Sequence, residues 1–396
     1  MNSYRSIPAI TIAACLLVAC GGQNDPETLP KGSFAAVVSF GDSLSDIGTY
    51  APATSLSGAG APPFFGGKFT TNETGDGTPN ANALGKVWVQ NLAASLGIVV
   101  TPAEVGFNGV STRCPAAAMP ALAASCTAYG QGGARVTDPH GIGHNADGSG
   151  ALTVPVVTQI ANHLARFGSF SKSDLILVFA GNNDVFIQLD VFAATAAQVQ
   201  AQLAAGTLSA AQASVQLATA QQSAEGVVRT AAQELAAAVK GRILANGAVY
   251  VAVIELGDIG DTPFGQSLPA SIRAVVTDLV RVFNSALVTG LAGERVRTID
   301  TFTLLKAISA DPAGHGFVNN TVAACDPAKI SALTGGAVVD GSSLFCNATP
   351  GAAYNTLRAG ADTMTWQFAD DVHPTTGGHK VISDTFAAQL KSFGWI

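Results

Sequence analysis

The chain has 396 residues, of which 48% are hydrophobic and only 12% are charged. This composition excludes a wholly disordered protein. The formal net charge is -7 at pH 7 and no Lys/Arg-rich run is present, which excludes a surface built to bind nucleic acid.

The N-terminal residues predict an export signal. Arg5 lies in a short polar start, and residues 7–18 form a mostly apolar stretch that is too short to span a bilayer. The stretch ends in Leu-Val-Ala-Cys, which resembles the lipobox of bacterial lipoproteins, whose cysteine is lipidated; the alternative is an ordinary secretory signal. We predict a signal peptide over residues 1–19, a lipid anchor on Cys20 and a tether over residues 20–33. The protein is then held at an outer membrane or cell surface, or otherwise is periplasmic or secreted.

Apolar runs bounded by Gly or polar residues predict strands that are buried on both faces. They cover residues 34–40, 174–180, 248–254 and, less cleanly, 296–300. Helical stretches follow these runs, over residues 83–96, 155–167, 225–244, 269–291 and 376–393. This alternation predicts a three-layer, flavodoxin-like α/β fold with a parallel sheet, whose ligands bind at the carboxyl ends of the strands.

Two segments depart from the alternation. Residues 191–224 are rich in Ala and Gln and are interrupted at residues 206–209, which predicts an inserted helical hairpin. The hairpin is either a lid over the site or a solvent-exposed helical extension without a role in the chemistry, and the sequence favours neither. Residues 51–82 are rich in Gly, Pro and Asn and predict a long functional or mobile loop.

Of the six cysteines, Cys15 lies inside the predicted signal and Cys20 at its end. In an oxidising compartment the other four allow three connectivities, and the sequence does not decide among them. We favour local pairs, because each closes a loop in a Gly-, Pro- and Ala-rich stretch and a loop of that size contributes roughly 3 kcal/mol. These pairs are Cys114–Cys126 and Cys325–Cys346.

A hydroxyl, a carboxylate and an imidazole stand in motifs near the two ends of the chain. Ser43 follows the first predicted strand in Gly-Asp-Ser-Leu, where glycine permits a tight turn. Asp370 precedes His373 by three residues, and a proline follows the histidine. A serine hydroxyl is a poor nucleophile unless an imidazole takes its proton and a carboxylate holds that imidazole in one tautomer. Ser43, His373 and Asp370 fit these roles.

With these motifs the chain resembles the GDSL (SGNH) family of serine esterases and lipases, whose blocks surround a Ser, a Gly, an Asn and a His. The matching blocks are residues 41–44 (GDSL), 130–134 (GQGGA), 181–184 (GNND) and 370–374 (DDVHP). The resemblance implies one hydrolase domain over residues 34–396. It also implies cleavage of carboxylic esters, acyl or lipid esters among them, through an acyl-serine intermediate and without a metal or organic cofactor.

The resemblance further implies a role for each matched residue. Ser43 is the nucleophile, His373 is the general base and then the acid, and Asp370 orients His373. The oxyanion hole consists of the backbone N–H groups of Ser43 and Gly133 and the side-chain amide of Asn183. Each such donor is worth roughly 3–4 kcal/mol of transition-state stabilisation.

Two of these assignments rest on family spacing. Gly133 is preferred to Gly132 because the second Gly of Gly-Gly-Ala holds the family's functional position. Asp370 is preferred to Asp371 because the family spacing is Asp-x-x-His, and Asp371 then caps a turn or faces solvent. Residues 69–72 (FTTN) also resemble the family's stretch between the first two blocks.

Other conspicuous residues have simpler interpretations. His140 and His144 have metal-like spacing, yet no helix places them on one face and a metal needs three or four ligands, so we assign them to a polar loop. His379 at the start of the last helix is structural, and Trp366 and Phe368 serve packing.

Three alternative functions remain open. Acyl transfer to another alcohol is the nearest, followed by phospholipase or thioesterase activity at the same site. A catalytically silent surface binding module belongs to a different class, since fold does not determine function. It predicts a broken catalytic position, whereas all the matched positions are intact.

Overall fold

The structure is a computed structural model. It describes residues 31–54, 66–73 and 85–396. The predicted signal peptide, Cys20 and most of the tether lie outside the described residues, as does much of the predicted long loop. The two ends of the described chain meet, because the amide of Gly32 donates to the carbonyl of Trp395 over 2.7 Å. Phe34 and Trp395 both pack their rings against Tyr250.

A six-stranded parallel sheet forms the middle layer, with strand order β2-β5-β1-β6-β7-β8. Its strands are β1 (Ala36–Gly41), β2 (Thr101–Pro102), β5 (Cys126–Ala128), β6 (Asp174–Phe179), β7 (Tyr250–Ile254) and β8 (Arg297–Ile299). The four predicted strands are confirmed to within two residues at each end. In β6 every residue is buried, as expected for a strand covered on both faces. The sequence did not predict β2 and β5, because two or three residues are too short to form a recognisable apolar run.

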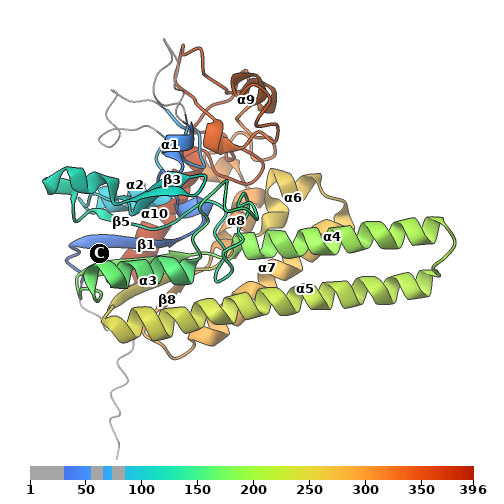
Figure 1. The fold of residues 1–396 in the computed structure, drawn as a ribbon, viewed down its shortest axis with the longest axis horizontal. Helices are drawn as coiled ribbons and strands as arrows, with labels where there is room; N and C mark the ends of the chain where they lie inside the picture. The colour runs from blue at the N-terminus through green and yellow to red at the C-terminus, as the bar shows by residue number, and fades with distance from the viewer. Residues whose placement is uncertain (1–30, 55–65, 74–84) are drawn as a thin grey trace, which may run out of the picture.

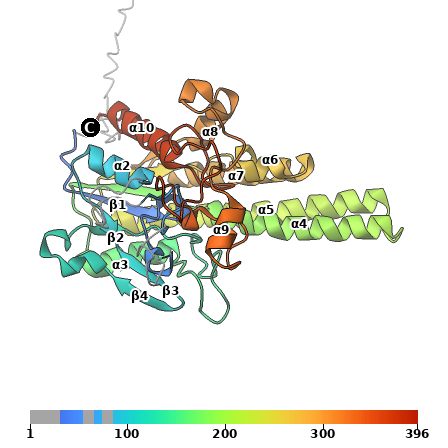
Figure 2. The same ribbon diagram turned by 90° about the horizontal axis from the view of Figure 1, so that it is seen from above.

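Helices cover both faces of the sheet, so the predicted three-layer α/β fold is confirmed (Figures 1 and 2). One face carries α2 (Trp88–Ser95) and α10 (Thr376–Ser392), and the other carries α3 (Val156–Phe167), α5 (Ala210–Ala238) and α7 (Ala270–Leu291). The pattern of α3 is typical. It buries Val156, Gln159, Ile160 and His163, which share one helical face, and it ends at Gly168 with a φ of 79°.

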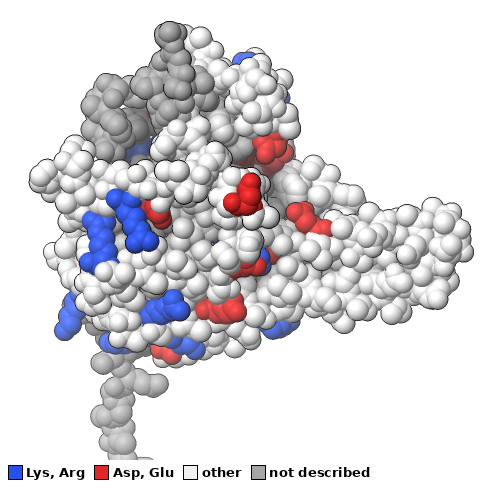
Figure 3. Space-filling model, in the orientation of Figure 1, with Lys and Arg blue, Asp and Glu red and all other residues white. Residues whose placement is uncertain are grey.

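The predicted hairpin is present as an arm that projects from the body (Figures 1 and 2). It is formed by the distal halves of α4 (Asn182–Ala204) and α5, and Ser209 caps α5 through a capping box with Gln212. Because α4 starts directly after β6 and α5 runs on toward β7, the arm is an extension of the crossover between these strands. Residues 191–224 contain no charged residue, and Figure 3 shows the outer arm as an uncharged surface.

The remaining elements are short and surround the carboxyl edge of the sheet or one flank. They are α1 (Ala51–Thr54), α6 (Pro263–Ser267), α8 (Thr301–Ala310), α9 (Pro327–Leu333) and the antiparallel pair β3 (Glu104–Phe107) and β4 (Val110–Arg113). In the described part of the chain one helix, α7, is long and apolar enough to cross a membrane by length and composition. Seven of its apolar residues, among them Leu279 and Phe283, are buried in the hydrophobic core, whereas Val288 is exposed.

Both favoured disulfides are formed. The Cα atoms are 5.3 Å apart in Cys114–Cys126 and 5.8 Å apart in Cys325–Cys346. Each pair lies in a small buried cluster separate from the main core. The disulfides therefore order the two loop-rich parts of the molecule that the main core does not reach.

Candidate active site

Ser43 follows β1 at its carboxyl end. The serine starts one turn of 3-10 helix, which the Asp42 side chain caps by accepting the amide of Leu44 at 3.2 Å. Glycine is needed at position 41, because a Cβ on Gly41 would lie 2.2 Å from the carbonyl oxygen of Phe179 on the neighbouring strand. The chain can therefore run close beside β6 and present the serine hydroxyl at the edge of the sheet where parallel strands bind their ligands.

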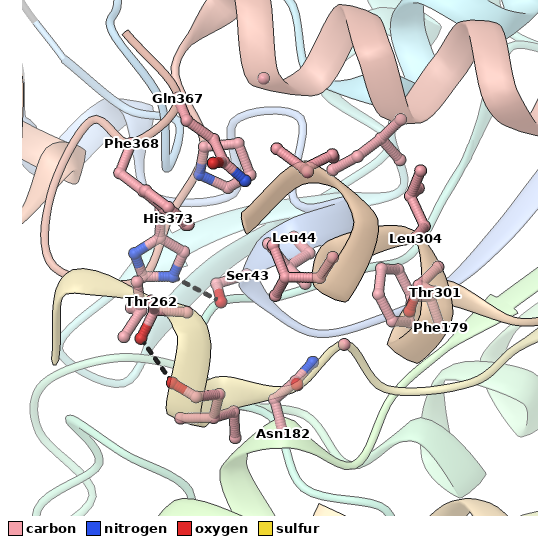
Figure 4. A pocket seen from close by; sticks show the side chains of 18 of the residues that line it. Ser43, Leu44, Phe179, Asn182, Thr262, Thr301, Leu304, Gln367, Phe368 and His373 are labelled. Atoms are coloured by element: carbon pink, nitrogen blue, oxygen red, sulfur yellow. Dashed lines mark hydrogen bonds between the residues drawn. The ribbon is translucent and has the colours of Figure 1, made fainter. Parts of the chain in front are cut away.

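The structure brings Ser43, His373 and Asp370 together. His373 Nε2 lies 2.8 Å from Ser43 Oγ (Figure 4). On the other side of the ring, His373 Nδ1 lies 2.8 Å from Asp370 Oδ2. The spacing of three residues has a local cause, because Asp370 Oδ1 accepts the backbone amides of Val372 and His373 at 3.0 and 2.7 Å. The carboxylate thus closes a tight turn that directs the imidazole back onto it.

The environment of Asp370 keeps this carboxyl group ionised. Its burial opposes ionisation, but the positive charge of His373 and hydrogen bonds from His373 and Ser343 outweigh this, and the pKa of Asp370 falls well below its usual range. An ionised Asp370 accepts the proton on His373 Nδ1, which leaves Nε2 free to accept from the Ser43 hydroxyl. This is the protonation state in which the imidazole can act as a base toward serine.

His379 supports His373 indirectly, through the ring of Phe69. The ring of Phe69 packs against that of His373, with centroids 4.8 Å apart. His379 holds this segment, because its Nε2 lies 3.2 Å from the carbonyl of Phe69 and its Nδ1 lies 3.3 Å from the amide of Trp88. Burial lowers the pKa of His379 to about 3, so it stays neutral. The structure therefore gives His379 the structural place expected from the sequence.

The buried carboxylate of Asp46 joins the GDSL block to the GQGGA block. The sequence analysis did not predict this role. Asp46 accepts the amides of Gly48 and Thr49 at 2.8 and 2.7 Å and the amide of Gly132 at 2.9 Å. Burial raises the pKa of Asp46 to about 6 against the effect of these hydrogen bonds. The only signal in the sequence is its position, three residues after Ser43.

Gly133 and Asn183 are two of the residues assigned to an oxyanion hole, and the structure gives each a distinct environment. Gly133 has a φ of 78°, and a Cβ there would lie 2.0 Å from the carbonyl oxygen of Ile142, so only glycine fits. Within the described ranges its amide donates to no protein acceptor. Asn183 is buried and donates from Nδ2 to the carbonyl of Ala134 at 2.9 Å. Its second amide hydrogen has no acceptor in the part of the chain that the structure describes.

A pocket of about 810 Å³ of empty space, partly open to solvent, lies against Ser43 and His373. Apolar side chains make most of its wall: Leu44, Phe179, Phe186, Ile259, Leu304, Leu305, Ile308, Phe317, Phe368, Val372 and Ile382. His373 is the only titratable side chain among the described residues that line it. Phe368 is part of this wall, whereas the sequence reading assigned it to packing. Residues 191–224 contribute nothing to the wall, so in this structure the arm does not cover the pocket.

Three of the remaining candidate residues lie elsewhere. The side chain of Asp371 is exposed, and its carbonyl accepts the amide of Phe264 at 2.9 Å. His140 contacts the side chain of its loop neighbour Asp138, and His144 contacts a backbone carbonyl. These three residues take no part in the arrangement around Ser43.

Comparison with known proteins identifies the family of the chain. The family model described as GDSL-like lipase/acylhydrolase matches residues 37–386. The crystal structure of an extracellular lipase from Streptomyces rimosus is similar at 14% sequence identity and a TM-score of 0.37, over 89% of this chain and 98% of that one. Among curated proteins, none matches. Because the family model spans nearly the whole described body, the chain belongs to the GDSL-like lipase/acylhydrolase family and is a carboxylic ester hydrolase.

Proposed function

We propose that this hydrolase is an exported enzyme that cleaves acyl esters through an acyl-Ser43 intermediate. The observation that carries the proposal is the chain of contacts from Ser43 Oγ through His373 to Asp370, at 2.8 Å for each step, beside an apolar pocket. The proposed hydrolase domain covers residues 34–396.

In the proposed mechanism, Ser43 Oγ attacks the ester carbonyl while its proton passes to His373 Nε2. Asp370 stabilises the imidazolium that forms. The tetrahedral intermediate then collapses, His373 protonates the leaving alcohol, and the acyl group remains on Ser43. Water takes the place of the alcohol, gives a proton to His373 as it attacks the acyl carbonyl, and releases the carboxylic acid with the proton returned to Ser43.

The negative oxygen of the intermediate is assigned to three donors: the amides of Ser43 and Gly133 and the side-chain amide of Asn183. Two features support this. Among the described residues, neither backbone amide has a protein acceptor. The amide of Gly132 is bound by Asp46 instead, which favours Gly133 over its neighbour. Donors fixed before the reaction need no reorganisation when charge develops.

The pocket supports an acyl chain as the part of the substrate that is recognised. A wall without charged side chains desolvates an alkyl chain at little cost, whereas a charged acyl group would lose its hydration without a partner. Short-to-medium acyl or lipid esters fit best, and phospholipid or thioester cleavage uses the same site. Acyl transfer to another alcohol is the second candidate, because the same acyl-Ser43 intermediate can be intercepted by a hydroxyl other than that of water.

Export and lipid anchoring on Cys20 belong to the same proposal. The two disulfides support an oxidising compartment, where such bonds persist. Metabolic labelling with a radioactive fatty acid, with a Cys20→Ala variant beside the full chain, tests the anchor. Label in both proteins, or in neither, contradicts lipidation at this residue.

The first test of the activity is hydrolysis of p-nitrophenyl esters of increasing acyl length by the chain without residues 1–19, beside its Ser43→Ala variant. We expect activity that rises with length over short and medium chains and is lost in the variant. Folded protein without activity on any ester moves the assignment to acyl transfer or to a silent binding module, and these two are separated by adding a donor ester together with an acceptor alcohol.

A further inference from the structure

Asp370 receives a hydrogen bond from a distant part of the chain. The backbone N–H of Ser343, 27 residues before Asp370, donates to Asp370 Oδ2 over 2.8 Å. The same oxygen lies 2.8 Å from His373 Nδ1, which is also 2.9 Å from Oδ1. The carboxylate thus faces the imidazole with both oxygens, and Oδ2 is shared with a fixed backbone donor. Ser343 is completely buried, and its own hydroxyl has no hydrogen-bond partner among the described residues. The hydrogen bond that this residue gives to Asp370 therefore comes from its backbone N–H.

A disulfide holds this donor in place. Ser343 starts a turn of 3-10 helix, Ser343–Phe345, and Cys346 follows directly. Cys346 is bonded to Cys325, whose amide donates to the carbonyl of Ala369 at 2.9 Å, one residue before Asp370. The disulfide and Ala369 belong to one buried cluster. The segment that supplies the donor is thus cross-linked to the segment that flanks the acceptor.

The opposite side of the donor segment is bound as well. Asn72 donates from Nδ2 to the carbonyl of Ser343 at 3.1 Å, and the amide of Gly67 donates to the carbonyl of Leu344 at 2.8 Å. Asn72 is completely buried. The peptide around Ser343 is therefore fixed on both sides, which a donor must be if it is to restrict the orientation of a carboxylate.

We infer that the backbone N–H of Ser343 is a positioning donor for Asp370 and that the Cys325–Cys346 disulfide keeps it there. This inference rests on the proposed roles of Ser43, His373 and Asp370. The donor fixes Oδ2 opposite His373 Nδ1 and stabilises the ionised carboxylate, and a backbone amide does so at every pH because it does not titrate.

The amide can be removed by one substitution. Proline suits the first position of a helical turn, and Ser342 before it has the extended ψ of 126° that a following proline requires. We compare Ser343→Pro with Ser343→Ala, which also lacks the hydroxyl but keeps the N–H. For the ester that the wild type cleaves best, we expect the kcat of Ser343→Pro to be about 10- to 100-fold below that of Ser343→Ala, as for one hydrogen bond to a charged group, with KM within about twofold.

The pH profile separates positioning from general damage. The titratable groups near Asp370 are His373, the exposed Asp371 and the neutral His379, and Ser343→Pro alters none of them directly. Removing a donor from the carboxylate leaves more negative charge on Oδ2 to stabilise the imidazolium form of His373, which cannot take the serine proton. The acidic limb of kcat should therefore move to higher pH in Ser343→Pro and stay in place in Ser343→Ala.

The two disulfides provide a matched comparison. The double variant Cys325→Ser/Cys346→Ser should lose kcat in the same direction as Ser343→Pro, whereas Cys114→Ser/Cys126→Ser, in a separate buried cluster, should keep it. Equal kcat values in Ser343→Pro and Ser343→Ala overturn the inference. If the proline variant does not fold, as judged by circular dichroism, equal effects of the two disulfide removals on kcat overturn it instead. An active Ser43→Ala variant would contradict the proposed function itself, which is a different result.

Discussion

Asn182 donates from Nδ2 to Asp42 Oδ2 over 3.0 Å and so joins the turn after β6 to the turn that carries the nucleophile. Asn182 lines the pocket beside Ser43, and its neighbour Asn183 donates from Nδ2 to the carbonyl of Ala134. Asp42 is completely buried, and burial raises its pKa to about 6 in spite of the bond from Asn182. At neutral pH the ionised carboxylate of Asp42 beside the nucleophile therefore lowers the free energy of unfolding.

The raised pKa of Asp42 predicts how the free energy of unfolding depends on pH. Because the pKa of Asp42 is raised from 3.8 to about 6 on folding, the folded state holds this proton more tightly than the unfolded state. Relative to an Asp42→Asn variant, the wild type should therefore lose unfolding free energy as the pH rises from about 4 to above 6, by up to about 3 kcal/mol. Urea unfolding at several pH values measures this difference, with the exposed Asp384→Asn as the control. A wild type that gains stability over the Asp42→Asn variant with rising pH would refute the prediction.

The role of Asp370 predicts a kinetic effect of its removal. In Asp370→Asn an amide faces His373 Nδ1, so the imidazole is held in the wrong tautomer and cannot take the serine proton. We expect kcat to fall by about 10⁴-fold with a much smaller change in KM. Steady-state kinetics on the best p-nitrophenyl ester test this, and Asp371→Asn, on the exposed neighbour, should keep kcat close to that of the wild type. Similar losses in both variants would show that the assignment to Asp370 is incorrect.

The proposed oxyanion hole predicts a loss at Asn183. Asn183→Ala removes a donor that acts only when charge develops on the carbonyl oxygen, so kcat should fall by about 10²–10³-fold while KM changes little. The same substitution removes the bond to the carbonyl of Ala134, and a thermal melt shows how far stability contributes. Inhibition by a trifluoromethyl ketone, which forms a tetrahedral adduct with the serine, should weaken in parallel with kcat. Undiminished inhibition would assign the donor to another residue.

The apolar pocket predicts that α8 limits acyl length. Leu304 on α8 is part of its wall (Figure 4). A larger side chain at this position, in Leu304→Trp, should lower kcat/KM for the longest ester that the wild type accepts by at least about tenfold, since each methylene excluded is worth about 0.8 kcal/mol. Hydrolysis of the acetate ester should change little. Leu304→Met, which nearly conserves volume, is the control. An unchanged length profile in the tryptophan variant would place the acyl chain elsewhere.

The parts of the molecule that could be predicted have strong local signals. The buried strands before Ser43 and Asn182 are recognisable as apolar runs, and the turn that links Asp370 to His373 is closed by residues only three apart. The two disulfides have a local signal as well, because each closes a short loop in a stretch with little other means of ordering itself.

The parts that could not be predicted depend on contacts between distant residues. The bond from Ser343 to Asp370 spans 27 residues and uses a backbone group that any amino acid except proline would supply. Asp46 is recognisable as important only when its three amide partners are seen together. The apolar part of the wall that α8 supplies consists of leucine and isoleucine residues, which the sequence does not distinguish from core residues. Only the position of the helix shows that they line the pocket.

The pairing of Gly32 with Trp395 has a practical consequence. Both residues lie near Tyr250, which begins β7, whereas Ser43 lies beyond the last residue of β1 at the other edge of the same parallel sheet. A fusion partner, an affinity tag or a solid support joined to either end of the body is therefore attached on the side away from the pocket. The catalytic face of a molecule immobilised in this way stays open to substrate from the surrounding solution.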